Sequence, residues 1–223
     1  APRGKSAECT PDAGSYRVPL AWALSQQGFN VSTMGTLRTG PQYVTPQWLM
    51  HEGHPGWRID QIDALLDKSL ATSPTAPDLI TIHLGTNDAG QGFNASVLET
   101  RMNALLNHTL AKVPKAQVFL ASIIAFPGRV GADVADHFNK ALPDIVNSFK
   151  ARGMMITYVP MVEWSGVCAP GGTESPLSGL CCQGHVHPTA AGYLRMASAF
   201  ALAIAEAQVL ADELPAETAS LVV

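Results

Sequence analysis

The chain has 223 residues, of which 47% are hydrophobic and 14% are charged, a balance that excludes an intrinsically disordered protein. It carries 14 Lys and Arg against 18 Asp and Glu, and without a basic run its net charge of −4 argues against nucleic-acid binding. The most apolar stretch, residues 197–211, is interrupted by Glu206 and Gln208 and is shorter than the roughly 20 residues of a membrane span, so no membrane association is expected.

Short apolar segments alternate with helical patterns along the chain. The expected strands are residues 29–33, 79–84, 117–124 and 154–159. The expected helices are residues 16–27, 59–70, 96–111, 134–152 and 190–210, and Pro143 should kink or split the fourth of them. This alternation predicts a doubly wound α/β protein with a parallel sheet, built as one domain over residues 1–223 and expected to be monomeric.

Three segments lie between or after these elements. Residues 35–56 and 165–184 read as long loops, which in a compact domain usually belong to a binding site. In an open α/β sheet that site is expected outside the carboxyl ends of the strands. Residues 212–223 read as a surface tail.

The cysteines and the glycosylation sequons indicate whether the protein is secreted. Four cysteines (Cys9, Cys168, Cys181 and Cys182) are too few for a disulfide scaffold, and their spacing does not match a zinc knuckle. Three Asn-x-Ser/Thr sequons, at Asn30, Asn94 and Asn107, favour a secreted glycoprotein that begins as a processed chain would. In such a protein Cys168 pairs with Cys181 or Cys182, and Cys9 is available to the other; buried free thiols are the alternative.

Three motifs carry side chains suited to acyl-transfer chemistry. His83-Leu84-Gly85-Thr86-Asn87-Asp88 ends a predicted strand, where an Asn amide can donate a hydrogen bond to a developing oxyanion. His185-Val186-His187-Pro188-Thr189 precedes the last helix, with Thr189 as its N-cap and a His placed as a general base. His51-Glu52-Gly53-His54-Pro55-Gly56-Trp57 forms a glycine-rich turn whose Gly56 amide can face the same cleft. Each motif alone would more often be structural.

Taken together, the motifs resemble the SGNH hydrolase superfamily, in its branch of carbohydrate esterases that includes acetylxylan esterases. The resemblance rests on Gly-Ser-Tyr-Arg-Val-Pro-Leu at 14–20, His-Glu-Gly-His-Pro-Gly-Trp-Arg-Ile-Asp at 51–60, His-Leu-Gly-Thr-Asn-Asp at 83–88 and His-Pro-Thr-Ala-Ala-Gly-Tyr at 187–193. It implies a flavodoxin-like three-layer α/β/α sandwich with a central parallel sheet and a secreted serine esterase that deacylates a carbohydrate ester, small or polymeric, without a cofactor.

The resemblance also implies roles for individual residues. It assigns the nucleophile to Ser6, the base to His187, and oxyanion donors to Gly56, Asn87 and the Ser6 amide. Trp57, Trp164, Asp88 and His185 are expected to contact the substrate, the two tryptophans by stacking on a sugar ring.

The chain departs from the family at two acids and at one strand. Lys5 occupies the place of the Asp that precedes the nucleophile, and Gly184 stands three residues before His187, where the family has the Asp that orients the base. The family also runs an apolar strand into the nucleophile motif at the centre of the sheet, whereas only residues 1–3 precede Gly4 here. We therefore expect that strand to be shortened or missing.

Two alternatives to an active esterase follow. A degenerate member of the family would bind a glycan or another small ligand in the old cleft without hydrolysing it. A metal-dependent site is the other, because five of the seven histidines fall at predicted strand ends or site loops, with Glu52 or Asp88 as an oxygen donor. Those histidines are His51, His54, His83, His185 and His187.

Overall fold

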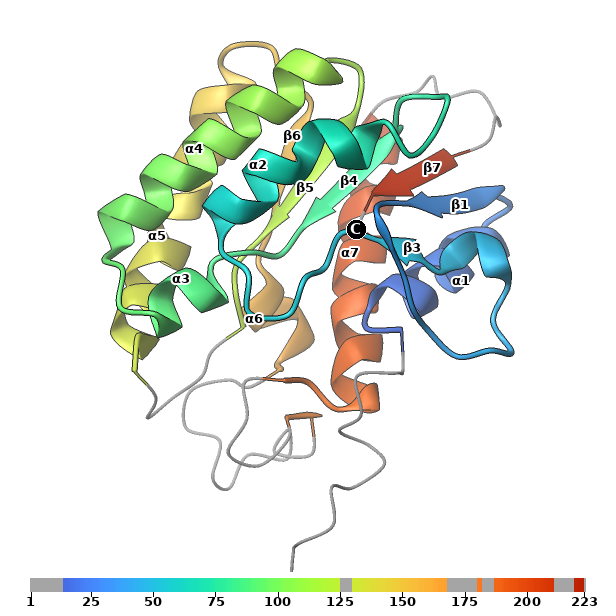
Figure 1. Ribbon diagram of the computed structural model, residues 1–223, viewed down its shortest axis with the longest axis horizontal. Coiled ribbons are helices and arrows are strands. Elements are labelled where there is room, and N and C mark those ends of the chain that lie inside the picture. The colour runs from blue at the N-terminus through green and yellow to red at the C-terminus, as the bar shows by residue number, and fades with distance from the viewer. Residues whose placement is uncertain (1–13, 125–129, 168–179, 182–186, 211–218, 223) are drawn as a thin grey trace, which may run out of the picture.

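A five-stranded parallel sheet forms the centre of the protein in this computed structural model (Figure 1). The structure describes residues 14–124, 130–167, 180–181, 187–210 and 219–222. The strand order is β1-β7-β4-β5-β6. The strands are β1 (Val31–Met34), β4 (Leu79–Ile82), β5 (Gln117–Ala121), β6 (Ile156–Val159) and β7 (Ala219–Val222).

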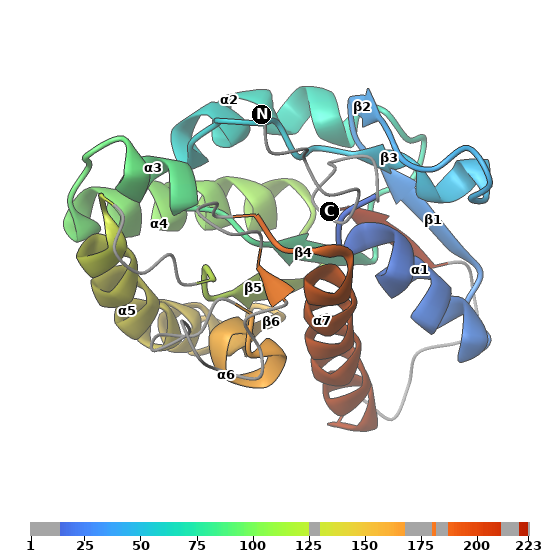
Figure 2. The same cartoon turned by 90° about the horizontal axis from the view of Figure 1, so that it is seen from below.

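Helices cover both faces of this sheet. Figure 2, which looks along the sheet from below, shows α2 (Ile59–Leu70), α4 (Ala95–Lys112) and α5 (Ala132–Lys150) on one face. The other face carries α1 (Arg17–Gln26), α6 (Met161–Ser165) and α7 (Ala190–Leu210). The arrangement confirms the predicted three-layer α/β/α sandwich.

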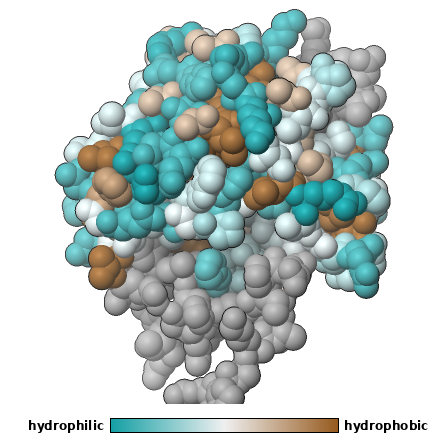
Figure 3. Space-filling view, viewed as in Figure 1, coloured by the Kyte–Doolittle hydropathy of each residue, from teal (hydrophilic) through white to brown (hydrophobic). Residues whose placement is uncertain are grey.

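Each face of the sheet has its own hydrophobic core. The core under α2, α4 and α5 contains Leu106, Phe138 and Phe149, and the core under α1 and α7 contains Leu20 and Phe200. All five side chains are almost fully buried. The space-filling view of the α2–α4 side is mainly hydrophilic with scattered apolar residues (Figure 3), as expected of amphipathic helices that turn one face to the sheet. Within the described residues, no helix is both long and apolar enough to cross a membrane.

The predicted elements are present, and α2 and α7 have the predicted bounds. Pro143 was expected to kink or split helix α5, and the split is wrong, since the helix runs through Pro143 as one element. Proline removes one backbone hydrogen bond and costs about 3 kcal/mol in a helix interior. The buried side chains of Phe138, Leu142, Ile145 and Phe149 offset this cost, because tertiary packing of one face supplies most of a helix's stability in a protein.

The C-terminal segment does not lie where the sequence suggested. Residues 219–222, expected to belong to a surface tail, form β7 between β1 and β4. Val31 pairs with Ala219 on one side, and Leu79 pairs with Leu221 on the other. We expected a shortened or missing strand inside the sheet, and the inner position beside β4 is filled by residues 219–222.

The predicted loop at residues 35–56 has structure of its own. It contains β2 (Leu37–Arg38) and β3 (Met50–His51), which pair antiparallel, and a 3-10 turn, η3 (Pro46–Trp48). The buried Arg17 side chain of α1 ties the segment down by donating to the carbonyls of Thr39 and Trp48. Burial lowers the pKa of Arg17 to about 10, so the guanidinium is still charged at neutral pH.

Candidate active site

A tight turn after β3 presents Gly56 at the protein surface. The Trp57 N–H donates to the His54 carbonyl at 3.2 Å, and Pro55 and Gly56 occupy the two central positions. Gly56 has φ of +79°, and proline followed by a residue of positive φ is the pattern of a type II turn. The positive φ explains why residue 56 is a glycine. Its exposed position leaves the turn open to a ligand.

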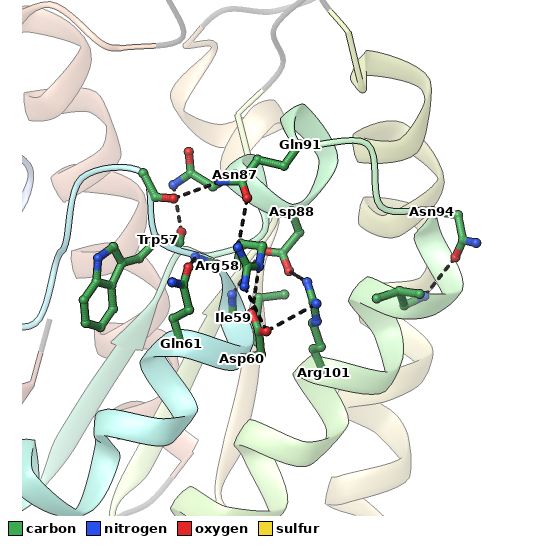
Figure 4. Close-up of polar contacts among 12 residues, drawn as sticks. Trp57, Arg58, Ile59, Asp60, Gln61, Asn87, Asp88, Gln91, Asn94 and Arg101 are labelled. Carbon is green, nitrogen blue, oxygen red and sulfur yellow. Dashed lines mark hydrogen bonds and ion pairs between the residues drawn. The ribbon is translucent and has the colours of Figure 1, made fainter.

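Asn87 lies against this turn from the other side. It belongs to α3 (Thr86–Gly90), a short helix that begins directly beyond β4. Its Nδ2 donates to the Trp57 carbonyl at 2.8 Å, and Gln91 of the same segment donates to the Gly56 carbonyl at 3.0 Å (Figure 4). A carboxamide nitrogen carries two hydrogens, so this bond fixes the amide orientation and leaves one N–H for another acceptor.

The close approach of the start of α3 to α5 depends on Gly85. This residue has φ of +122°, and a Cβ added there would lie 2.9 Å from the Phe138 ring. A larger residue at this position would displace either the Phe138 ring or the start of α3, the helix that carries Asn87. The structure thus brings together Gly56, Trp57 and Asn87, which the sequence placed in one site.

Asp88 has a different environment from the one we expected. Its side chain is fully buried, and its two oxygens accept from the Ile59 N–H at 3.0 Å and from Arg101 at 2.6 Å. Arg101 also lies 3.3 Å from Asp60, which is paired with Arg58 (Figure 4). The expected substrate contact is therefore corrected to a structural role, in which Asp88 joins α3 to the first turn of α2.

His187 lies just before α7 and is exposed. The following residues fix its backbone, since Pro188 forms a β-bridge with Cys181 and the Thr189 N–H donates to the Leu180 carbonyl at 2.9 Å. Thr189 Oγ1 accepts the Gly192 N–H at 3.2 Å, which is the predicted N-cap bond of α7. Figure 1 shows the start of α7 at the same end of the sheet as α3 and α6.

Of the remaining residues that the sequence assigned to the site, the structure describes only Trp164. Trp164 lies on α6, after β6, and is 38% exposed, so its ring is accessible to a ligand. Ser6, Lys5, Gly184 and His185 lie outside the described residues. So do Cys9, Cys168 and Cys182, and the cysteine pairing remains a prediction.

Two of the histidines that suggested a metal site, His51 and His83, are bound to protein groups. His51 Nδ1 accepts the Gly53 N–H, and its Nε2 lies 2.7 Å from Thr39 Oγ1. His83 Nε2 accepts the Ile124 N–H at 3.2 Å. Over the part of the chain that the structure describes, no group of three or more His, Cys, Asp or Glu is arranged to hold a metal ion.

Burial keeps two of these histidines neutral. It lowers the pKa of His83 from 6.5 to about 4. Burial, followed by the charge of Arg17, lowers the pKa of His51 to about 4 as well. Between about pH 4 and pH 6.5 the unfolded chain therefore binds more protons than the folded protein, so stability rises with pH across this window.

We predict that acidification from pH 7 to pH 4.5 destabilises the protein, with each buried histidine contributing up to about 3 kcal/mol. His83→Gln retains an acceptor for the Ile124 N–H but does not titrate, so it should flatten the pH dependence of the urea midpoint. His137→Gln is the control, because His137 is exposed on α5. A His83→Gln variant with the wild-type pH dependence would contradict the assignment.

The sequence suggested Glu52 only as a metal ligand and did not suggest Arg101 at all. In the structure Glu52 contacts His54 at the start of the Gly56 turn, and Arg101 of α4 pairs with Asp88. The sequence carried a signal for the first only, in its position inside the His51–Trp57 motif, and none for the second.

The structure thus combines a three-layer α/β/α fold with an oriented carboxamide after β4 and a His before the last helix. The chain belongs to the GDSL-like Lipase/Acylhydrolase family, which matches residues 27–195. Membership places it among ester hydrolases.

Individual relatives agree with this family. The chain is 24% identical over 211 residues to a multidomain esterase of Ruminococcus flavefaciens, covering 83% of this chain and 25% of that protein. It thus spans about a quarter of that relative's length. Among solved structures it is similar to the Clostridium thermocellum family 3 carbohydrate esterase, with 24% identity, a TM-score of 0.73 and coverage of 93% of this chain and 96% of the other. A family 3 carbohydrate esterase of Talaromyces cellulolyticus has 20% identity, a TM-score of 0.72 and coverage of 92% and 95%. At these identities the structural likeness shows the fold.

Proposed function

We propose that the protein deacylates carbohydrate esters, most simply acetyl esters, through an acyl-enzyme on Ser6. The observation that carries the proposal is the Asn87 carboxamide, which the Trp57 carbonyl holds beside the Gly56 turn at 2.8 Å. A donor oriented before the reaction stabilises a developing oxyanion without reorganising, which is usually the largest single contribution to this chemistry.

The proposed reaction has two halves. His187 accepts the proton of the Ser6 hydroxyl as its oxygen attacks the ester carbonyl, and the resulting oxyanion accepts hydrogen bonds from Asn87 and from the Gly56 and Ser6 amides. Collapse breaks the bond to the sugar oxygen, which leaves with the proton from His187. Water then attacks the acyl-enzyme with His187 again as base, releasing the acid and restoring Ser6.

The sugar part of the substrate is proposed from the aromatic residues and from the relatives. Trp57 adjoins the oxyanion turn, and the partly exposed Trp164 lies on α6 at the same end of the sheet (Figure 1). Indole rings stack well on the apolar faces of sugars. Two of the similar structures are named as carbohydrate esterases, which supports a carbohydrate ester over a lipid.

Secretion and glycosylation belong to the same proposal. Asn30, Asn94 and Asn107, the three sequon asparagines, are all exposed in the folded protein. A glycan on any of them would point into solvent. The exposure supports an extracellular protein that meets polysaccharide outside the cell.

Ser6→Ala is expected to abolish hydrolysis of p-nitrophenyl acetate and acetylated xylo-oligosaccharides, with kcat falling by at least about 10⁴-fold, because the nucleophile is removed. Ser198→Ala is the matched control, since Ser198 is exposed on α7. Unchanged turnover in the folded Ser6→Ala variant would exclude an acyl-enzyme on this residue.

A binding protein without esterase activity is the second candidate, because Lys5 and Gly184 stand where the family has acids. If this candidate is correct, the wild type lacks esterase activity and the double variant Lys5→Asp, Gly184→Asp gains it. Binding of xylo-oligosaccharides by the wild type, measured by calorimetry, would then supply its function. A fully active wild type excludes this candidate.

A further inference from the structure

A buried carboxylate–imidazole pair lies directly behind the oxyanion turn. Glu52 follows β3 and is 7% exposed. Its Oε1 lies 2.5 Å from His54 Nε2, and its two oxygens also accept the Thr36 hydroxyl at 2.6 Å and the Thr36 N–H at 2.9 Å. The Glu52 carboxylate therefore binds both Thr36, which precedes β2, and His54, which begins the turn.

Hydrogen bonds keep this carboxylate ionised. Burial by itself would raise the pKa of Glu52, but the bonds from Thr36 and His54 outweigh it and lower the pKa below its usual value. An ionised Glu52 accepts a hydrogen bond from His54 Nε2. The imidazole is thus held at one edge by a buried charge.

The held imidazole in turn supports the turn that carries Gly56. Its ring stacks on the Trp57 indole with centroids 4.0 Å apart and planes inclined by 17°. The backbone carbonyl of Trp57 is the group that fixes the Asn87 carboxamide. A continuous set of contacts therefore runs from Glu52 through His54 and Trp57 to Asn87.

From this arrangement we propose that Glu52 and His54 are positioning residues for the oxyanion site. Neither touches the reacting atoms in this role. The pair holds the Trp57 side chain by stacking and so keeps this residue in place, and the Trp57 carbonyl in turn orients the Asn87 amide and its free N–H. The inference rests on the proposed function, because it concerns the same oxyanion.

The role predicts a loss of turnover without a loss of ground-state binding. Donors that stabilise the oxyanion act mainly in the transition state, so their misplacement lowers kcat and leaves KM nearly unchanged. A displacement of about 1 Å is expected to lower kcat by about 10- to 100-fold. A pair that merely stabilised the fold would lower the melting temperature and leave the kinetics of the folded enzyme unchanged.

The experiment uses Glu52→Gln and His54→Ala, with kcat and KM measured on p-nitrophenyl acetate below the melting temperature. Inhibition by an alkyl boronic acid, which forms a tetrahedral adduct with the nucleophile, is compared with inhibition by acetate. Both variants should lose boronate affinity by about the same factor as kcat/KM and keep acetate affinity within about twofold. Unchanged kcat and boronate affinity in the folded variants would overturn the proposal.

The control is a second imidazole–carboxylate pair that lies away from the turn. His108 Nδ1 of α4 is 2.8 Å from Asp63 of α2, so His108→Gln removes a similar contact and should leave the kinetics unchanged. Two further variants separate the contacts, since His54→Phe keeps the stacking on Trp57 and His54→Gln keeps a donor for Glu52. Partial retention of kcat in either, relative to His54→Ala, supports the proposed chain of contacts.

A second readout keeps this test separate from the proposed function. Hydrogen exchange of the Asn87 side-chain amide, followed by NMR, should be faster in Glu52→Gln and His54→Ala than in the wild type and in His108→Gln. If the wild type hydrolyses no ester, the proposed function fails and this exchange alone decides whether the pair positions Asn87. Equal exchange rates in all four proteins would refute the positioning role.

Discussion

Replacing Asp88 with alanine is expected to lower the free energy of unfolding by about 3 to 5 kcal/mol, the usual cost of breaking a buried ion pair from one side. Asp88 is fully buried, and both of its oxygens are used, by the Ile59 N–H and by Arg101. The variant leaves the first N–H of α2 without its acceptor and leaves Arg101 with Asp60 alone. Urea unfolding of the purified variant measures the change.

Two further variants test the cause of this loss. Asp136→Ala removes a carboxylate from the exposed Lys140–Asp136 pair and should cost about 1 kcal/mol or less. Asp88→Asn retains an acceptor for the Ile59 N–H and should be destabilised less than Asp88→Ala. If the free energy of unfolding of Asp88→Ala lies within about 1 kcal/mol of the wild-type value, the buried pair is not important for joining α3 to α2.

Asn87→Ala is the change with the largest expected effect on turnover among the described residues. Loss of one oxyanion donor lowers kcat by about 100- to 1,000-fold in a comparable site, which corresponds to about 2.7 to 4 kcal/mol. KM should change little, because the ester carbonyl of the bound substrate is a weaker acceptor than the oxyanion. Steady-state kinetics on p-nitrophenyl acetate would measure both constants.

Asn103→Ala is the matched control for this prediction. Asn103 donates to the Glu99 carbonyl within α4, so its loss removes an amide from the protein without touching the turn. Asn87→Asp gives a further comparison, since a carboxylate would repel both the Trp57 carbonyl and the oxyanion. An Asn87→Ala enzyme that keeps kcat within about threefold of the wild type is not compatible with Asn87 as an oxyanion donor.

Local sequence signals predicted most of the fold. Helix α2 shows why, because its buried residues Ile59, Ile62 and Leu66 recur at the helical spacing and Gln61 accepts the Arg58 N–H at its start. The four predicted strands are apolar and lie between glycines and prolines. The resemblance of short motifs also placed Gly56, Trp57 and Asn87 in one site. Asn87 follows β4 of the parallel sheet, whereas Gly56 and Trp57 follow β3 of the separate two-stranded sheet.

Features that depend on distant contacts were not predictable in the same way. Residues 219–222 have no signal that distinguishes a short apolar tail from a strand, and their pairing partners lie far away in sequence. Asp88 was assigned to the substrate because its position after a strand is clear from the sequence, whereas its burial under Arg101 is not. Proline disfavours a helix interior locally, but the packing of α5 against the sheet outweighs this effect at Pro143 and the helix is not split.

The position of β7 has a consequence for the order in which the protein folds. Strands β4, β5 and β6 follow one another in sequence with their helices between them, so they can assemble while the chain is still being made. Strand β1 is hydrogen-bonded to the rest of the sheet through β7. Such pairing between distant segments is slow and comes late in folding. Strand β1 is made before β4, β5 and β6 but is therefore expected to be secured in the sheet after them.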